Sequence, residues 1–118
     1  MPAYVAKSAV GIYEGDVVVV FDQSKDGNAV TQCQSIAYTG TTGKENRISI
    51  LNTSGQTVTV KQAATDTATT DYQPLTDADT NTAITCANNS GIVFTVTGPF
   101  IGFTFAAAPS AGKLTVMR

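Results

Sequence analysis

The side chains that most often carry out catalysis or bind metals are scarce in this sequence. Its 118 residues contain no histidine, which removes the commonest general base, the commonest metal ligand and every Ser-His or Cys-His nucleophile pair. The two cysteines, Cys33 and Cys86, cannot by themselves make a four-ligand zinc site. We therefore expect a chain that is not an enzyme and carries no cofactor or metal, with an Asp-only or Thr-based site as the remaining alternative.

One acidic segment has the spacing of a cation-binding loop at its start. Asp77, Asp79 and Asn81 match the opening of an EF-hand calcium loop, but the sixth position is Thr82 and the twelfth is Asn88. The calcium loop needs glycine at the sixth position for a sharp turn and a bidentate glutamate at the twelfth. The segment is therefore interpreted as a solvated loop, and an irregular ion site using Asp77 and Asp79 stays open.

Composition excludes several classes of function. Apolar residues make up 42% of the chain and charged residues only 14%, with a net charge of −2. This balance is not that of a disordered chain, and the absence of any Lys/Arg cluster leaves no electrostatic site for nucleic acid. With so few charges, much of the surface must be weakly polar or apolar. Either a partner covers that surface, or Thr, Ser, Asn and Gln solvate it.

Neither a membrane segment nor an export signal is evident. The longest apolar run, residues 17–21, is far shorter than the ~20 residues that span a bilayer. The N-terminus lacks a charged region followed by an apolar one, so we expect no signal peptide and synthesis in a reducing compartment. Cys33 and Cys86 are then expected to be free and buried, with a disulfide as the alternative if their strands are neighbours.

The dominant pattern in the chain has a period of two, which is typical of strands that bury one face. Val58 and Val60 alternate with threonines, and Ile101, Phe103 and Phe105 alternate with Gly and Thr. Turn-forming Gly, Asn and Pro residues separate such runs, and no stretch has a helical pattern. We predict an all-β single domain over residues 1–118, a two-sheet antiparallel β-sandwich, jelly-roll-like with about eight strands. The predicted strands lie near residues 16–22, 30–39, 46–52, 56–62, 82–87, 91–97, 100–106 and 112–118, with a further one near 3–12.

Two segments depart from this pattern, and together with the N-terminal segment they are candidates for contact with a partner. Residues 17–21 are apolar at consecutive positions, which predicts burial on both faces by a second layer or by a partner. Residues 63–82 form a long polar loop of a length that usually has a function, and residues 1–13 could form an N-terminal arm. Tyrosine suits such contacts because it combines an apolar ring with a polar tip. The candidate interface residues are Tyr4, Tyr13, Val18, Val20, Tyr72 and Leu75.

About a third of the chain resembles a known class of proteins. Residues 90–105, with the step Gly98-Pro99-Phe100 into a strand, are followed by an Ala/Gly turn and a last alternating strand over residues 109–116. This pattern resembles the closing strands of small bacteriophage virion proteins, most of all capsid decoration (cement) proteins. The resemblance implies a β-sandwich, often trimeric, that clamps neighbouring major capsid subunits from outside, and it brings no catalytic residues.

Two functions are therefore expected from different classes. The first is a capsid decoration protein that is made in the host cytoplasm, lies on the capsid surface of the virion, binds the major capsid protein and forms a homo-oligomer, with a trimer favoured. The alternative is a receptor- or carbohydrate-binding module of a phage tail or surface adhesin, which would display an aromatic or Asp/Asn cluster on its loops. The absence of Trp weakens the carbohydrate-binding alternative. Neither function involves nucleic acid or a membrane.

Overall fold

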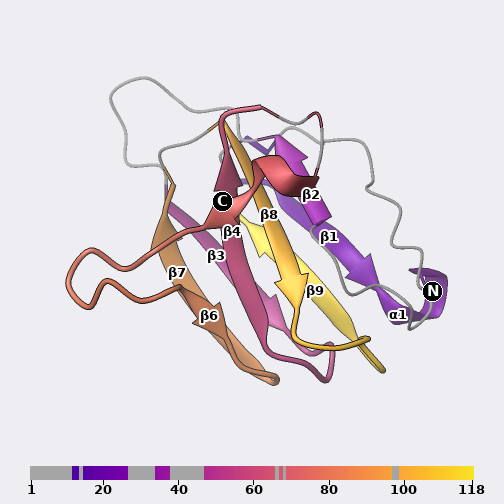
Figure 1. The fold of residues 1–118 in the computed structure, drawn as a ribbon. Helices are drawn as coiled ribbons and strands as arrows, with labels where there is room; N and C mark the ends of the chain where they lie inside the picture. The colour runs from indigo at the N-terminus through magenta and orange to yellow at the C-terminus, as the bar shows by residue number, and fades with distance from the viewer. Residues whose placement is uncertain are drawn as a thin grey trace.

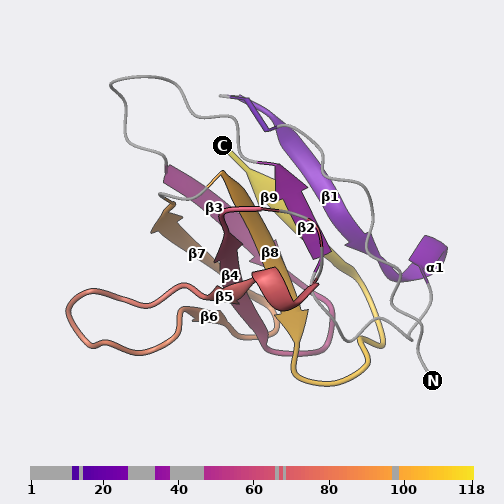
Figure 2. The same cartoon turned by 45° about the horizontal axis from the view of Figure 1, so that its top comes forward.

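Two antiparallel sheets pack face to face in the computed structural model, which describes residues 12–13, 15–26, 34–37, 47–65, 67, 69–96 and 99–118 (Figure 1, Figure 2). The four-stranded sheet has the order β1-β9-β3-β7, and the five-stranded sheet has the order β2-β8-β4-β5, with β6 also beside β4. The elements are β1 (Val17–Asp22), α1 (Gln23–Asp26), β2 (Gln34–Ala37), β3 (Arg47–Asn52), β4 (Val58–Ala63), η1 (Thr69–Asp71), β5 (Gln73–Pro74), β6 (Thr85–Cys86), β7 (Ser90–Thr95), β8 (Phe100–Phe105) and β9 (Lys113–Met117).

The strand order is that of a jelly roll. Strands β1, β3, β7 and β9 lie in one sheet, and the strands between them in the chain, β2, β4 to β6 and β8, lie in the other. Both β5 and β6 pair with β4, β5 beside Lys61 and Gln62 and β6 beside Val58 and Thr59, so they share one strand position. The eight positions and their crossings between two sheets are those of the double-sheet jelly roll. The predicted all-β sandwich of about eight strands is confirmed.

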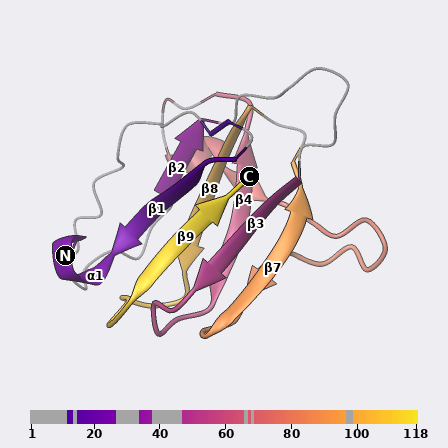
Figure 3. The same cartoon turned by 180° about the vertical axis from the view of Figure 1, so that it is seen from behind.

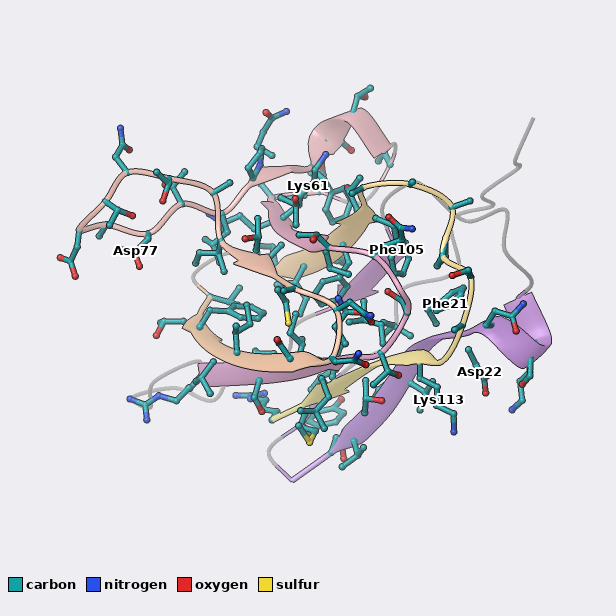
Figure 4. All side chains as sticks on the ribbon, turned by 90° about the horizontal axis from the view of Figure 1, so that it is seen from below. Phe21, Asp22, Lys61, Asp77, Phe105 and Lys113 are labelled. Atoms are coloured by element: carbon teal, nitrogen blue, oxygen red, sulfur yellow. The ribbon has the colours of Figure 1, made fainter. Side chains whose placement is uncertain are left out.

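The core lies between the sheets and is built by the inward half of each alternating strand. An aromatic contact across the layers joins Phe21 of β1 and Phe105 of β8, whose ring centroids are 5.1 Å apart in an edge-on arrangement (Figure 4). The strand residues that are completely buried on this inner side include Ile48, Ile50, Val58, Val60, Cys86, Ile101, Phe103, Leu114 and Val116. The period of two in the sequence therefore corresponds to one buried face on each sheet.

The consecutive apolar residues 17–21 lie in β1, where a β-bulge accounts for their pattern. The register between β1 and β9 shifts between Val19 and Phe21, so Val20 is an additional residue in a β-bulge. Val20 and Phe21 are both buried, while Val17 and Val19 remain 65% and 45% exposed. The prediction that the second layer buries both faces of this strand is wrong, because β1 lies at the edge of its sheet with one face toward the core.

The segment that was predicted as a polar loop, residues 63–82, contains regular secondary structure. Ala63 ends β4, η1 and β5 follow, and the chain then leaves the sheet as a projecting hairpin closed by the bridge between Thr76 and Ala83 (Figure 1). It returns as β6 at Thr85. The predicted loop thus includes β5, which shares one strand position of the sandwich with β6. The projecting hairpin separates β5 from β6. Of the predicted N-terminal arm, only residues 12 and 13 are among those described.

A polar centre joins the two sheets at one end of the sandwich. Asn52, the last residue of β3, is completely buried, and its Nδ2 donates hydrogen bonds to the carbonyl oxygens of Gln56 (2.7 Å) and Cys86 (3.0 Å). Its Oδ1 accepts from the backbone N–H of Ser54 (3.0 Å) and from the Ser54 hydroxyl (2.6 Å). The Asn52 carbonyl accepts from the N–H of Asn89. One side chain therefore links β3 of the first sheet to β6 of the second and satisfies their buried polar groups.

Replacing Asn52 by alanine tests the importance of this centre. The substitution removes the acceptor of both the N–H and the hydroxyl of buried Ser54, and each buried unsatisfied group costs about 1–3 kcal/mol. We expect Asn52→Ala to lower the free energy of unfolding by about 3 kcal/mol in urea titrations. The matched control is Asn88→Ala, because exposed Asn88 accepts a single hydrogen bond from the N–H of Gly55. Equal losses in the two variants would contradict this assignment.

Candidate interaction surface

The outer face of the four-stranded sheet gathers side chains from all four of its strands. Because directly paired residues point to the same side of a sheet, the register defines rows across this face. One row consists of Val17, Met117, Ser49 and Val93, and the next consists of Val19, Thr115, Leu51 and Gly91. Figure 3 looks onto this sheet and shows β1, β9, β3 and β7 side by side in the foreground. We call these eight residues the outer face.

The outer face is apolar and open to solvent. Val17, Val19, Leu51 and Val93 are 65%, 45%, 48% and 61% exposed. They are four of the five large apolar residues that are exposed in the described part of the chain, the fifth being Tyr13. Single exposed apolar residues are ordinary on a protein surface, whereas a contiguous group of them is typical of a binding surface.

Gly91 on the edge strand β7 leaves room for the side chain of Leu51, which extends across from β3. A Cβ atom at this position would approach Cδ2 of Leu51 to 2.8 Å and the carbonyl oxygen of Ile50 to 3.2 Å. The Leu51 side chain therefore lies over Gly91, its cross-strand partner. A larger residue at position 91 would lift Leu51 away from the sheet.

Charged residues lie at the corners of the outer face and not within it. At one end, Asp22 and Lys113 are directly paired on β1 and β9 and lie beside each other (Figure 4). Hydrogen bonding to Ser24 holds the pKa of the Asp22 carboxyl below its ordinary value, with a smaller contribution from the positive charge of Lys113. At the diagonally opposite corner, Arg47 pairs with Thr95. The two rows between these corners contain no ionisable side chain.

The other sheet differs because part of its outer face is covered by the chain itself. Ala63 and Tyr72 are buried together in a small cluster, against which Phe100 packs. The segment that carries Tyr72 begins with η1, which lies in front of β4 and β8 in Figure 1. The two sheets thus share a core, but only the five-stranded sheet has part of its outer face covered by the described chain.

The predicted interface residues divide into three groups. Tyr13 is 61% exposed, Val18 is half-buried against the core, and Tyr4 lies outside the described residues. Val20, Tyr72 and Leu75 are only 3%, 3% and 8% exposed. These three side chains lie inside the single chain, since Val20 turns inward at the bulge and the other two anchor the segment that includes β5 to the body of the protein. Their role at an interface stays a prediction. Tyr13 and Val18 are not brought together as one site.

Sequence reasoning missed most of the outer face. Leu51 and Val93 each follow a core residue directly, in the runs Ile50-Leu51 and Ile92-Val93-Phe94. An apolar residue that breaks the alternation of an otherwise amphipathic strand points outward, and this signal was present for both. Met117 pairs with both Val17 and Ser49, a relation that only the strand order reveals.

The projecting hairpin encloses a second, more polar feature. An open pocket of about 340 Å³ lies between the hairpin and β7, lined by Asp77, Thr80, Thr82, Ala83, Ile84, Thr85, Ile92 and Val93. The carboxylate of Asp77 is engaged in the hairpin turn, where Oδ1 accepts from the N–H groups of Asp79 (2.8 Å) and Thr80 (3.3 Å). Within the described ranges, no three Cys, Asp or Glu side chains come together as a metal site would require.

Cys86 is held as a buried thiol. Its side chain is completely buried in the core, and Sγ donates to the carbonyl oxygen of Ser90 at 3.3 Å. The cysteine is free, and burial raises the pKa of its thiol above the ordinary value of 9.0. Since the thiolate is the reactive form, this thiol is a poor nucleophile at neutral pH. Cys33, the other predicted free thiol, lies outside the described residues.

Comparisons of the chain with protein-family models, with curated proteins and with solved structures found no match. In the part of the chain that the structure describes, no helix has the length and apolar character needed to cross a membrane.

The raised pKa of Cys86 predicts a loss of stability at alkaline pH. Above pH 9 the unfolded chain releases the thiol proton while the folded chain retains it, so the free energy of unfolding falls as the pH rises, by up to about 1.4 kcal/mol per pH unit from this one group. Cys86→Ser removes the ionising group and keeps a donor for Ser90. Urea unfolding from neutral to alkaline pH should show a shallower decline for the variant than for the wild type. Identical slopes would contradict the assignment.

Proposed function

We propose that this chain is a non-enzymatic structural protein of a bacteriophage virion. In this role it binds the outside of the capsid, contacts the major capsid protein and stabilises the contacts between neighbouring capsid subunits. Its place is the capsid surface, after synthesis in the host cytoplasm. The proposal starts from the resemblance of residues 90–105 and 109–116 to the closing strands of capsid decoration proteins.

The observation that carries the proposal is the exposed, uncharged outer face. Val17, Val19, Leu51 and Val93 form an open apolar surface on a scaffold whose core is already complete without them. A chain that works as a free monomer gains nothing from such a surface, whereas a component of an assembly needs one to exclude water at its contacts. Jelly rolls are common among viral capsid and lectin domains, although a fold by itself does not define a function.

The chemistry of the described residues supports a structural role. The one described thiol is buried and its pKa is raised. One oxygen of the Asp77 carboxylate, Oδ1, is committed to backbone N–H groups. A decoration protein requires rigidity and resistance to modification, and both properties follow from a closed jelly-roll core with few reactive groups.

Particles that lack this chain test the proposal. We expect the protein to co-purify with virions in a fixed ratio to the major capsid protein. We also expect particles assembled without it to release their genome at a lower temperature, because the contacts it supports between capsid subunits are missing. The measurement is thermal genome release followed by a DNA-binding dye, with purified protein added back as the control. Equal release temperatures with and without the protein would contradict the function.

A receptor- or carbohydrate-binding module is the second candidate, and the projecting hairpin favours it. The pocket beside β7 combines the hydroxyls of Thr80, Thr82 and Thr85 with the carboxylate of Asp77, which are groups able to bind sugar hydroxyls. This candidate predicts saturable binding on a glycan array that Thr82→Val weakens. A blank array, together with binding to capsids, would discard it.

A further inference from the structure

Two sheets with unequal outer faces suggest which surface another molecule covers. On the five-stranded sheet, Tyr72 buries itself against Ala63 and Phe100. On the four-stranded sheet, none of the described elements covers Leu51 and Val93 in this way, and they are about half exposed or more, at 48% and 61%. The inner sides of both sheets contribute to one core, and neither Leu51 nor Val93 belongs to it.

We infer that a second copy of this chain binds the outer face of β1, β9, β3 and β7. The two four-stranded sheets then pack face to face about a twofold axis. The inference rests on the proposed structural function and names the partner of the outer face. Two sheets packed in this way lie about 10 Å apart, with strands inclined by about 30° as a result of their twist. Side chains of the two faces then interdigitate as in the interior of a sandwich.

The charge distribution favours a second copy over a charged partner. The two rows of the outer face contain only apolar, hydroxyl and glycine residues, so two copies meet without repulsion between like charges. Asp22 and Lys113 at the rim form a pair of opposite sign, which is itself neutral. Arg47 at the opposite corner is the remaining charge on this side of the sheet that the register places. A partner with a strong positive or negative surface would therefore find little complementary charge on the outer face.

The size of the face sets the strength of the expected association. The whole four-stranded sheet, with the corner residues around the outer face included, has strands about 4.8 Å apart and about 20 Å long and covers roughly 400 Å² in projection. When two such faces pack together, they bury on the order of 1,000 Å² of solvent-accessible surface, because protruding side chains add to the projected area. This value is near the lower limit for specific protein contacts. The dimer is therefore weak in dilute solution and is strengthened where copies are held close together, as on the surface of a particle.

The symmetry of the contact distinguishes the inferred twofold dimer from the trimer that the resemblance implies. A patch that packs against itself closes a twofold pair, whereas a threefold ring needs two different surfaces that fit each other. The described residues collect four of their five exposed large apolar side chains on one face. That concentration favours the self-complementary pair.

Sedimentation equilibrium of the purified full-length chain tests the inference. We expect the mean mass to rise from that of one chain to that of two between micromolar and millimolar concentration. Leu51→Glu should remain a monomer over this range, because its carboxylate would lie on a central strand of the contact. The matched control, Gln73→Glu, places the same charge on exposed β5 of the other sheet and should associate like the wild type. Circular dichroism and thermal unfolding verify that each variant is folded.

A mixing experiment keeps the test independent of the folding of any one variant. Leu51→Lys should also be monomeric alone, and an equimolar mixture with Leu51→Glu should recover the dimer through opposite charges. A wild-type chain that stays monomeric, a trimer mass, or a Leu51→Glu variant that dimerises normally would each overturn the inference. Dimers that fail to bind capsids would instead count against the proposed function and leave the self-association intact.

Discussion

The hydrogen bonds of Asn52 are the constraint on which the arrangement of the strands depends. Asn52 and Ser54 are the two completely buried polar residues in the described part of the chain, and their bonds hold β3, the β3–β4 turn and β6 together. The adjoining β8–β9 turn is bound to the same place, since the N–H of Ser110 donates to the Ser54 carbonyl. A shift of β3 by one residue would expel Asn52 from this centre and turn the whole strand over.

The outer face follows from that fixed register. With Asn52 inward, Ile48 and Ile50 enter the core and Leu51 must point to solvent. The pairing of β3 with β9 and β7 then carries the same alternation to Met117 and Val93, and the bulge at Val20 lets β1 fill the core while Val17 and Val19 point outward. The interior and the exposed apolar surface are thus two results of one register, and a change that preserves the first also preserves the second.

The sequence predicted the fold better than the site, for physical reasons. Alternation and turn residues locate strands because both are local, and the positions of β1, β3, β4, β8 and β9 were predicted within about two residues. The split of one strand position into β5 and β6 depends on pairing with β4, and the bulge at Val20 depends on β9, so neither is visible locally. Tyr72 and Leu75 were expected at an interface because their surroundings in the sequence are polar, although distant residues bury them.

A contact surface loses its exposure to solvent when the protein assembles, so the outer face should become covered. The most direct measurement is carbene footprinting of side chains, which compares the dilute protein with the concentrated protein and with intact particles. We expect labelling of Val17, Leu51, Val93 and Met117 to fall together in both assembled samples, while labelling of exposed Pro74 on the other sheet does not change in the concentrated protein. Undiminished labelling of the four outer-face residues in both assembled samples would contradict it.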